Sequence, residues 1–206
     1  MVRTEVVVIG GSAGGMRAVR GILDALGGIR TSVMCVVLHR SPERSPLLEV
    51  LQTYTALPVH EPDDSPWGCP PGTITVAPAG YHMLIGRRRT LTAEPHSPVT
   101  PYEAAPGVRA HLTLDPPVAY SRPSIDVAFT SAADFAGSAI AVLLSCANED
   151  GAAGCAAIKA AGGRVVLQDP STCEADIAVR AAMRKVEPDY VADPTGIGRW
   201  LSHELR

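Results

Sequence analysis

The chain has 206 residues, of which 46% are apolar and 19% are charged, and its formal net charge is −3. This length allows one domain with a substantial core and is short for two. The charge balance gives no electrostatic reason to expect binding to nucleic acid or to an anionic membrane. No apolar run reaches the roughly 18 residues of a membrane span, and the N-terminus lacks the organisation of a signal peptide. We therefore expect a cytoplasmic globular domain without membrane insertion.

Five cysteines are scattered along the chain, at Cys35, Cys69, Cys146, Cys155 and Cys173. They form no CxxC pair and have no metal-ligand spacing. This pattern is typical of reduced thiols in a cytoplasmic protein, and it predicts no metal site.

The N-terminal part of the chain alternates strand and helix patterns. A β-branched run at residues 5–10 is typical of a strand buried on both faces of a parallel sheet. Apolar residues at helical spacing predict a helix over residues 13–26. A second buried strand over residues 32–38 and a helix over residues 45–54 follow. This order predicts a right-handed βαβ unit in a parallel sheet.

The middle of the chain, residues 58–123, is rich in proline and glycine. Short strand patterns occur at residues 73–77 and 82–85. We interpret this region as a small hairpin region followed by a long connecting loop over residues 94–122.

Regular order returns at Pro123, and Ser124 is placed to cap a helix that runs to about Phe135. The remaining predicted elements are strands at residues 139–144 and 164–167 and near Tyr190, with helices over residues 151–161, 177–186 and 197–204. The alternation predicts an α/β domain, and the absence of internal repeats favours one domain over residues 1–206.

The turn after the first strand, residues 10–15, reads GGSAGG. It departs from the dinucleotide-binding pattern GxGxxG because Ser12 occupies the second glycine position. The second strand also ends at His39, where such a fold would need an acid for the ribose. The turn does fit GxSxG, in which small residues let a sharp strand-to-helix turn expose a nucleophilic serine. A glycine-rich turn that only caps a helix with Ser12 would read the same way.

His39 stands at the end of the second strand as Ser12 stands at the end of the first. Adjacent strands lie about 4.8 Å apart, and in a doubly wound sheet such ends open on one crevice. A lone histidine after a strand is often only a loop residue. Its pairing with Ser12 favours a catalytic role.

A third group would orient the imidazole. Asp150 follows the strand at residues 139–144 and lies at the same sheet edge, although it would also suit a helix N-cap. Asp169, which follows the next strand, is a rival, whereas Asp126 reads as a first-turn helix charge. The backbone N–H groups after Ser12, around Ala13 and Gly14, are placed to stabilise an oxyanion.

Several segments in this order resemble the catalytic domain of the chemotaxis protein-glutamate methylesterases over nearly the whole chain. They are VVVIGGSAGG around Ser12, VVLHRSP around His39, VAPAGYHMLI around His82, RPSIDVAFTSAA from Arg122, LLSCANEDGAAG around Asp150 and AGGRVVLQDPSTC ending at Cys173.

The resemblance implies a doubly wound, mostly parallel sheet with helices on both faces, in a Rossmann-like three-layer arrangement. It places a catalytic triad on Ser12, His39 and Asp150, and so favours Asp150 over Asp169. The implied enzyme is a carboxylic ester hydrolase of chemotaxis signal transduction, which needs no cofactor. Its implied substrates are glutamate methyl esters on chemoreceptor-like protein helices, with deamidation of glutamines as a related activity.

The chain departs from the family at two loops. The family usually reads Thr-Gly-Met-Gly-x-Asp-Gly at the acid, whereas residues 145–151 read SCANEDG. Ala147 and Asn148 are therefore candidates for an altered substrate wall. A Gly-Met-Pro turn of the family is replaced by IAV at residues 177–179. Many members also carry an N-terminal receiver domain, and this sequence predicts a stand-alone catalytic domain.

These departures keep two alternatives open. One is an esterase that acts on a different protein or on a small ester. The other is a catalytically degenerate member that serves as a regulatory or binding module. The Ser-His-Asp set favours an enzyme, and the altered loops favour the alternatives. The oligomeric state has no signature in the sequence.

Overall fold

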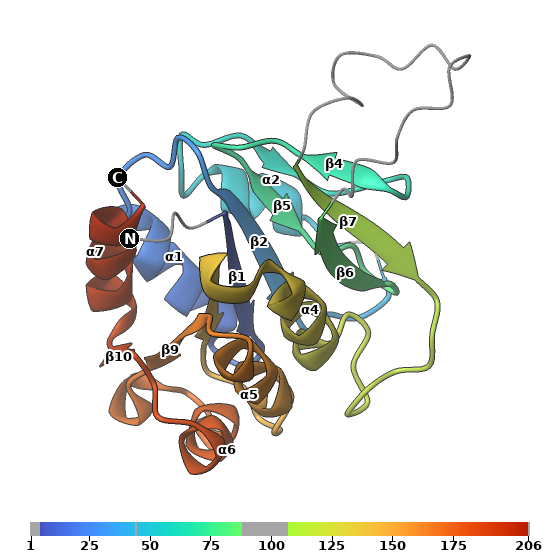
Figure 1. The fold of residues 1–206 in the computed structure, drawn as a ribbon. Helices are drawn as coiled ribbons and strands as arrows, with labels where there is room; N and C mark the ends of the chain where they lie inside the picture. The colour runs from blue at the N-terminus through green and yellow to red at the C-terminus, as the bar shows by residue number, and fades with distance from the viewer. Residues whose placement is uncertain (1–4, 44, 88–106, 206) are drawn as a thin grey trace.

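The computed structural model describes residues 5–43, 45–87 and 107–205. Its centre is a sheet of seven strands, which are β1 (Val6–Gly11), β2 (Val33–Leu38), β3 (Val59–His60), β5 (Ile74–Val76), β8 (Ala139–Leu143), β9 (Arg164–Gln168) and β10 (Tyr190–Ala192). Their order in space is β10-β9-β8-β1-β2-β5-β3, and all neighbours pair in parallel (Figure 1).

The strand order reverses at β1. From β1 the chain first forms β2, β3 and β5 on one side, with β5 between β2 and β3, and it later returns to the other side of β1 with β8, β9 and β10. Gly11 at the end of β1 pairs with Leu38, and Gly10 pairs with Leu143. The carboxyl ends of β1, β2 and β8 therefore meet at one edge, which is where ligands bind in open α/β sheets.

Helices cover both faces of this sheet. On one face lie α1 (Gly15–Ala25), α2 (Leu47–Gln52) and α7 (Pro194–Glu204), and on the other lie α4 (Ile125–Ala132), α5 (Ala152–Ala160) and α6 (Ile177–Lys185) (Figure 1). A hydrophobic core lies on each face of the sheet, and the side chains of β1 point alternately into one core and the other. Val7 and Ile9 pack with α1 and α7, and Val6 and Val8 pack with α4 and α5. Side chains alternate in this way along any strand. The predicted fold class is confirmed.

Only part of the predicted hairpin region forms a separate antiparallel sheet, because the strand expected at residues 73–77 is β5 and joins the parallel sheet. The three strands of the antiparallel sheet are β4 (Trp67–Cys69), β6 (His82–Arg87) and β7 (Val108–Thr113), in the order β4-β7-β6. Residues 108–113 were expected within the connecting loop at 94–122, and that part of the prediction is wrong; residues 94–106 lie outside the described residues. Val108 and Ala110 are buried beneath the sheet while Arg109 and His111 are more exposed, an alternation that surrounding prolines and glycines obscured.

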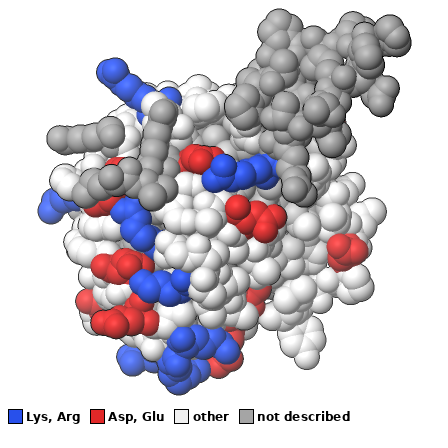
Figure 2. Space-filling view, viewed as in Figure 1, with Lys and Arg blue, Asp and Glu red and all other residues white. Residues whose placement is uncertain are grey.

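Acidic and basic side chains lie next to one another on the face shown in Figure 2. That face offers no extended surface of a single sign. Across the described residues, no helix combines the length and apolar character that crossing a membrane requires.

α4 packs closely against its neighbours because glycines stand at two contacts. A Cβ added at Gly10 of β1 would lie 2.3 Å from Ile125 Cγ2, and one added at Gly154 of α5 would lie 2.4 Å from Phe129 Cβ. Both distances are too short for any side chain, so the chain needs glycine at these positions.

We predict that Gly154→Ala lowers the free energy of unfolding by about 1–3 kcal/mol, because the added methyl group forces α4 and α5 apart. Urea denaturation measures this change. Gly28→Ala is the matched control: no atom lies within 4 Å of the added Cβ, so its effect should stay within about 0.5 kcal/mol. Equal effects of the two substitutions would contradict the packing argument.

Candidate active site

Three strand ends carry the candidate residues to one edge of the sheet. Ser12 follows β1, His39 follows β2, and Asp150 follows β8 after a short loop. Backbone hydrogen bonds tie these ends together: the His39 N–H donates to Gly11 O over 3.1 Å, and the Ser12 N–H donates to Ser145 O over 2.9 Å. The site thus lies at the switch point of the sheet.

His39 and Asp150 are in direct contact. His39 Nε2 lies 2.7 Å from Asp150 Oδ2. The carboxylate is buried and accepts three further hydrogen bonds, from Ser124 Oγ (2.9 Å), the Ile125 N–H (2.7 Å) and the Asp126 N–H (2.9 Å). Burial raises the pKa of Asp150, but these hydrogen bonds outweigh it and hold the pKa below its usual value. Asp150 is therefore an ionised carboxylate at the N-terminus of α4.

Asp150 does not cap its own helix. Gly151 is the N-cap of α5, and its φ of +99° is one that favours glycine. Asp126 Oδ1 instead accepts the N–H groups of Gly151 (2.9 Å) and Gly154 (2.7 Å). Asp126 is thus in the first turn of α4, as predicted, and it also serves α5. Each aspartate thus accepts hydrogen bonds from the N-terminus of the other's helix: Asp150 binds the start of α4, and Asp126 binds the start of α5. These bonds hold α4 and α5 together next to His39.

The surroundings of His39 favour its charged form. Burial lowers the pKa of His39, but the hydrogen bond to Asp150 and the nearby Cys146 together raise it to about 9. Asp150 dominates among the contacts that raise the pKa, because it lies at 2.7 Å whereas Cys146 Sγ lies 4.0 Å from Nδ1. At neutral pH the ring is therefore an imidazolium that donates from both nitrogens.

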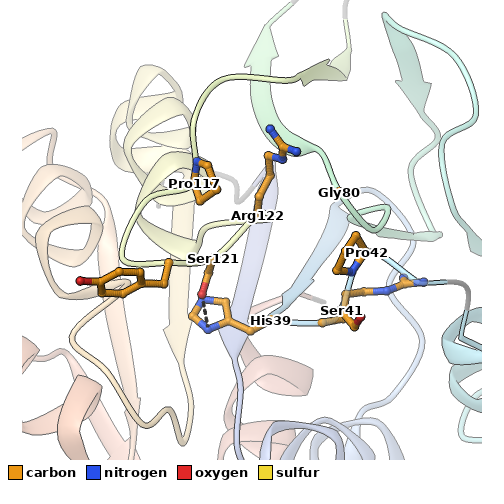
Figure 3. A pocket seen from close by; sticks show the side chains of 9 residues that line it. His39, Ser41, Pro42, Gly80, Pro117, Ser121 and Arg122 are labelled. Atoms are coloured by element: carbon orange, nitrogen blue, oxygen red, sulfur yellow. Dashed lines mark hydrogen bonds between the residues drawn. The ribbon is translucent and has the colours of Figure 1, made fainter.

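The second ring nitrogen of His39 faces Ser121, which lies in the loop before α4. Ser121 Oγ is 3.1 Å from His39 Nδ1 (Figure 3). Ser12 is partly buried, and among the described residues its hydroxyl has no hydrogen-bond partner. The structure thus joins His39 to Asp150 and leaves Ser12 without a hydrogen bond to the ring. Ser121 was missed by sequence reasoning, since nothing in the predicted loop distinguished it.

The backbone after Ser12 has free donors. Gly14 is the N-cap of α1, with a φ of 74°, and a Cβ there would lie 2.8 Å from Glu174 Cβ. Within the described part of the chain, the N–H groups of Ala13 and Gly14 donate to no acceptor. They lie at the positive end of the α1 dipole, which suits an anion.

The loop before Asp150 is held by the side chain of Asn148. Asn148 Oδ1 accepts the Asp150 N–H (3.0 Å) and the Cys146 thiol (3.1 Å), and Nδ2 donates to Ala119 O (3.1 Å). Cys146 and Asn148, which stand where the family has glycines, do not have a positive φ. Ala147 is exposed and small. Where the family has flexible glycines, this loop is therefore held by the side-chain hydrogen bonds of Asn148.

A cavity of about 390 Å³ opens beside His39 (Figure 3). Its lining consists of His39, Arg40, Ser41, Pro42, Gly80, Pro117, Tyr120, Ser121 and Arg122. The lining contains two arginines and the imidazole but no acidic side chain. Neither Ser12 nor Ala147 and Asn148 belongs to it.

The sequence matches the CheB methylesterase family over residues 7–201. The chain belongs to the CheB methylesterase family. A relative from Leptospira interrogans, provisionally named a protein-glutamate methylesterase/protein-glutamine glutaminase, is 32% identical over 91% of this chain and 88% of its own length. Protein-glutamate methylesterase/protein-glutamine glutaminase 2 of Methanosarcina acetivorans is also 32% identical, over 82% of this chain and 44% of its own.

The fold matches that of a solved member of the CheB methylesterase family. The crystal structure of the Thermotoga maritima CheB methylesterase catalytic domain superposes with a TM-score of 0.82 and 26% identity, covering 98% of this chain and 99% of the other. These matches place the chain among carboxylic ester hydrolases.

Asp169, the rival acid, makes no hydrogen bond to His39 among the described residues. Its carboxylate accepts the Ser171 N–H (2.8 Å) and the Ser171 hydroxyl (2.7 Å), which lower its pKa. It caps the short 3₁₀ helix Pro170–Thr172. Over residues 5–43, 45–87 and 107–205, no three His, Cys, Asp or Glu side chains gather to hold a metal ion.

We predict that Asp150→Asn lowers the pKa of His39 from about 9 to about 6.5 or below, because it removes the charge that opposes the effect of burial. An NMR titration of the imidazole measures the shift. Asp169→Asn is the control and should leave the titration of His39 in place. A His39 pKa that stays near 9 without the Asp150 carboxylate would refute the pairing.

Proposed function

We propose that this chain hydrolyses protein glutamate methyl esters through a triad of Ser12, His39 and Asp150, with deamidation of glutamine as a related activity. The observation that carries this proposal is the buried carboxylate of Asp150, which lies 2.7 Å from His39 Nε2 at the switch point of the sheet. The GxSxG turn ends at the same edge with free N–H groups. Membership of the CheB methylesterase family supports the choice of ester hydrolysis.

The contacts of His39 support a different role for each of its two ring nitrogens. Asp150 holds the proton on Nε2, so Nδ1 is the atom that acts as base. Once Nδ1 is unprotonated, it takes the proton of Ser12 Oγ as that oxygen attacks the ester carbonyl. The carbonyl oxygen gains negative charge, which the N–H groups of Ala13 and Gly14 stabilise. His39 then donates that proton to the departing methoxy oxygen, so that the C–O bond breaks and methanol leaves. Water attacks the acyl-enzyme while His39 takes its proton, and His39 returns this proton to Ser12 Oγ as the glutamate carboxyl is released.

The proposed substrates are methylated helices of chemoreceptor-like proteins in the cytoplasm. The curated relatives are named for action on protein glutamate and glutamine. The second candidate is an esterase for a different protein or a small ester, and Ala147 favours it. This exposed alanine stands where the family places a methionine, so the rim has lost a long apolar contact beside the acid.

The first prediction of this proposal is that a fluorophosphonate labels Ser12, because only an activated serine attacks phosphorus at a useful rate. Peptide mass mapping of folded protein identifies the labelled residue. Ser12→Ala should abolish both labelling and ester hydrolysis. Asp150→Asn should lower kcat by up to about 10⁴-fold, with Asp169→Asn close to wild type. An unlabelled Ser12 in folded, unmodified protein would reject the triad.

The second prediction concerns specificity. Hydrolysis of methylated receptor helices should be slow relative to typical members of the family, while small activated esters should still be turned over, because the catalytic residues lie on strand ends and the altered wall lies on loops. Methanol release from receptors and nitrophenol release from p-nitrophenyl acetate measure the two rates. Ala147→Met is the test variant and should raise only the receptor rate. Family-like receptor rates in the unmodified chain would disprove the altered specificity.

A further inference from the structure

The proposed triad needs Nδ1 of His39 for Ser12, and in the structure another serine hydroxyl lies against that nitrogen. Asp150 occupies His39 Nε2, so Nδ1 is the only ring atom left for a hydroxyl. Ser121 Oγ lies 3.1 Å from Nδ1 and lines the cavity, whereas Ser12 Oγ has no partner among the described residues. The triad chemistry of the proposed function therefore requires Ser121 to give up this contact.

The backbone around Ser121 lacks the features of a nucleophile. The N–H of Ser121 donates to Val118 O over 2.8 Å. Pro123 has no N–H, and the N–H of Ser124 already donates to a buried histidine ring over 3.2 Å. Residues 121–124 therefore offer no pair of adjacent free N–H groups for an oxyanion. The turn after Ser12 does offer such a pair, so Ser12 remains the better nucleophile.

Ser121 is held against His39 by a tight turn. Val118 and Ser121 exchange backbone hydrogen bonds of 3.1 and 2.8 Å, and the two residues between them have positive φ values, 48° for Ala119 and 64° for Tyr120. Residues other than glycine rarely adopt this conformation. Asn148 Nδ2 donates to Ala119 O over 3.1 Å, which ties the turn to the acid loop. The placement of Ser121 is thus enforced by several contacts.

We propose that Ser121 is a positioning residue that occupies Nδ1 of His39 in the resting enzyme and must leave before Ser12 can transfer its proton. This inference rests on the proposed function of the site. In the charged ring, Nδ1–H donates to Ser121 Oγ. In the neutral ring, Nδ1 accepts from Ser121 Oγ–H. In either state the contact excludes the hydrogen bond from Ser12 that proton transfer needs.

Other charged and titratable groups near His39 are already defined. Asp150 contacts Nε2, Cys146 Sγ lies 4.0 Å from Nδ1, and Arg40 and Arg122 line the same cavity. Arg40 pairs with Glu61, and Arg122 donates to backbone carbonyls at residues 114 and 115. Removal of the Ser121 hydroxyl leaves all these contacts in place, so its effect on His39 can be measured alone.

The test compares unmodified protein with Ser121→Ala and Ser121→Thr. Alanine keeps the backbone bonds to Val118 and removes only the hydroxyl, and threonine retains it. An NMR titration should show that Ser121→Ala lowers the His39 pKa by about one unit, because the bond that the charged ring donates is stronger than the bond that the neutral ring accepts. Ser121→Thr should restore the original value. Ser171→Ala removes a hydroxyl that bonds Asp169 and should change nothing.

The same variants are then assayed on p-nitrophenyl acetate. Ser121→Ala should raise kcat/KM at pH 7 by about threefold to tenfold, because the lower His39 pKa leaves more of the ring unprotonated and Ser121 no longer occupies Nδ1. Loss of activity in Ser121→Ala together with fluorophosphonate labelling of Ser121 would make Ser121 the nucleophile and overturn the proposal. An unchanged titration and unchanged kinetics would overturn it as well.

The two readouts separate this inference from the proposed function. If unmodified protein turns over no ester and Ser12 is never labelled, the esterase proposal fails. Even then, the NMR titration of His39 in unmodified protein and in Ser121→Ala decides whether Ser121 is hydrogen-bonded to Nδ1, since the titration does not require an active enzyme.

Discussion

The burial of the Asp150 carboxylate is the constraint on which the rest of the site depends. An ionised group taken out of water is costly unless hydrogen bonds replace its hydration. Here four donors do so: the Ile125 and Asp126 N–H groups, the Ser124 hydroxyl and His39 Nε2. The carboxylate therefore fixes the start of α4 and the orientation of His39 at once, and neither can shift without leaving a buried charge unpaired.

This arrangement explains why α4 and α5 pack so closely beside the site. Asp150 precedes α5 but binds the N-terminus of α4, while Asp126 lies in α4 and binds the N-terminus of α5. Each helix dipole is thus complemented by an acid from its neighbour. The glycine at position 154 allows the helices to approach, and the paired caps set their register. Helix packing and imidazole orientation are consequently one structural unit.

The strands β1, β2 and β8 and the three residues that follow them could be placed from the local sequence pattern alone. Buried β-branched runs mark β1, β2 and β8, and parallel strands bring their carboxyl ends together. The hydrogen bonds between Asp126 and α5 and the contact of Ser121 with His39 arise from tertiary packing, which the hydrophobic periodicity of the sequence cannot predict. The turn that carries Ser121 is also hidden, because Ala119 and Tyr120 adopt positive φ without the glycine or asparagine that would announce it. β7 was missed for a related reason: proline- and glycine-rich flanks masked a six-residue alternation.

The division between strand ends and loops also determines which parts of the site can change. Ser12 and His39 are held by backbone pairing at the strand ends, and the Asp150 carboxylate is held by the N-terminus of α4. The wall is different, since Asn148 links the acid loop to the turn at Ala119, and that turn places Ser121 on His39. Asn148, which stands where the family has glycine, is thus linked to the imidazole by two hydrogen bonds, one from Asn148 to Ala119 and one between Ser121 and His39. The altered acid loop is therefore connected to both nitrogens of His39, to Nε2 through Asp150 and to Nδ1 through the turn that carries Ser121.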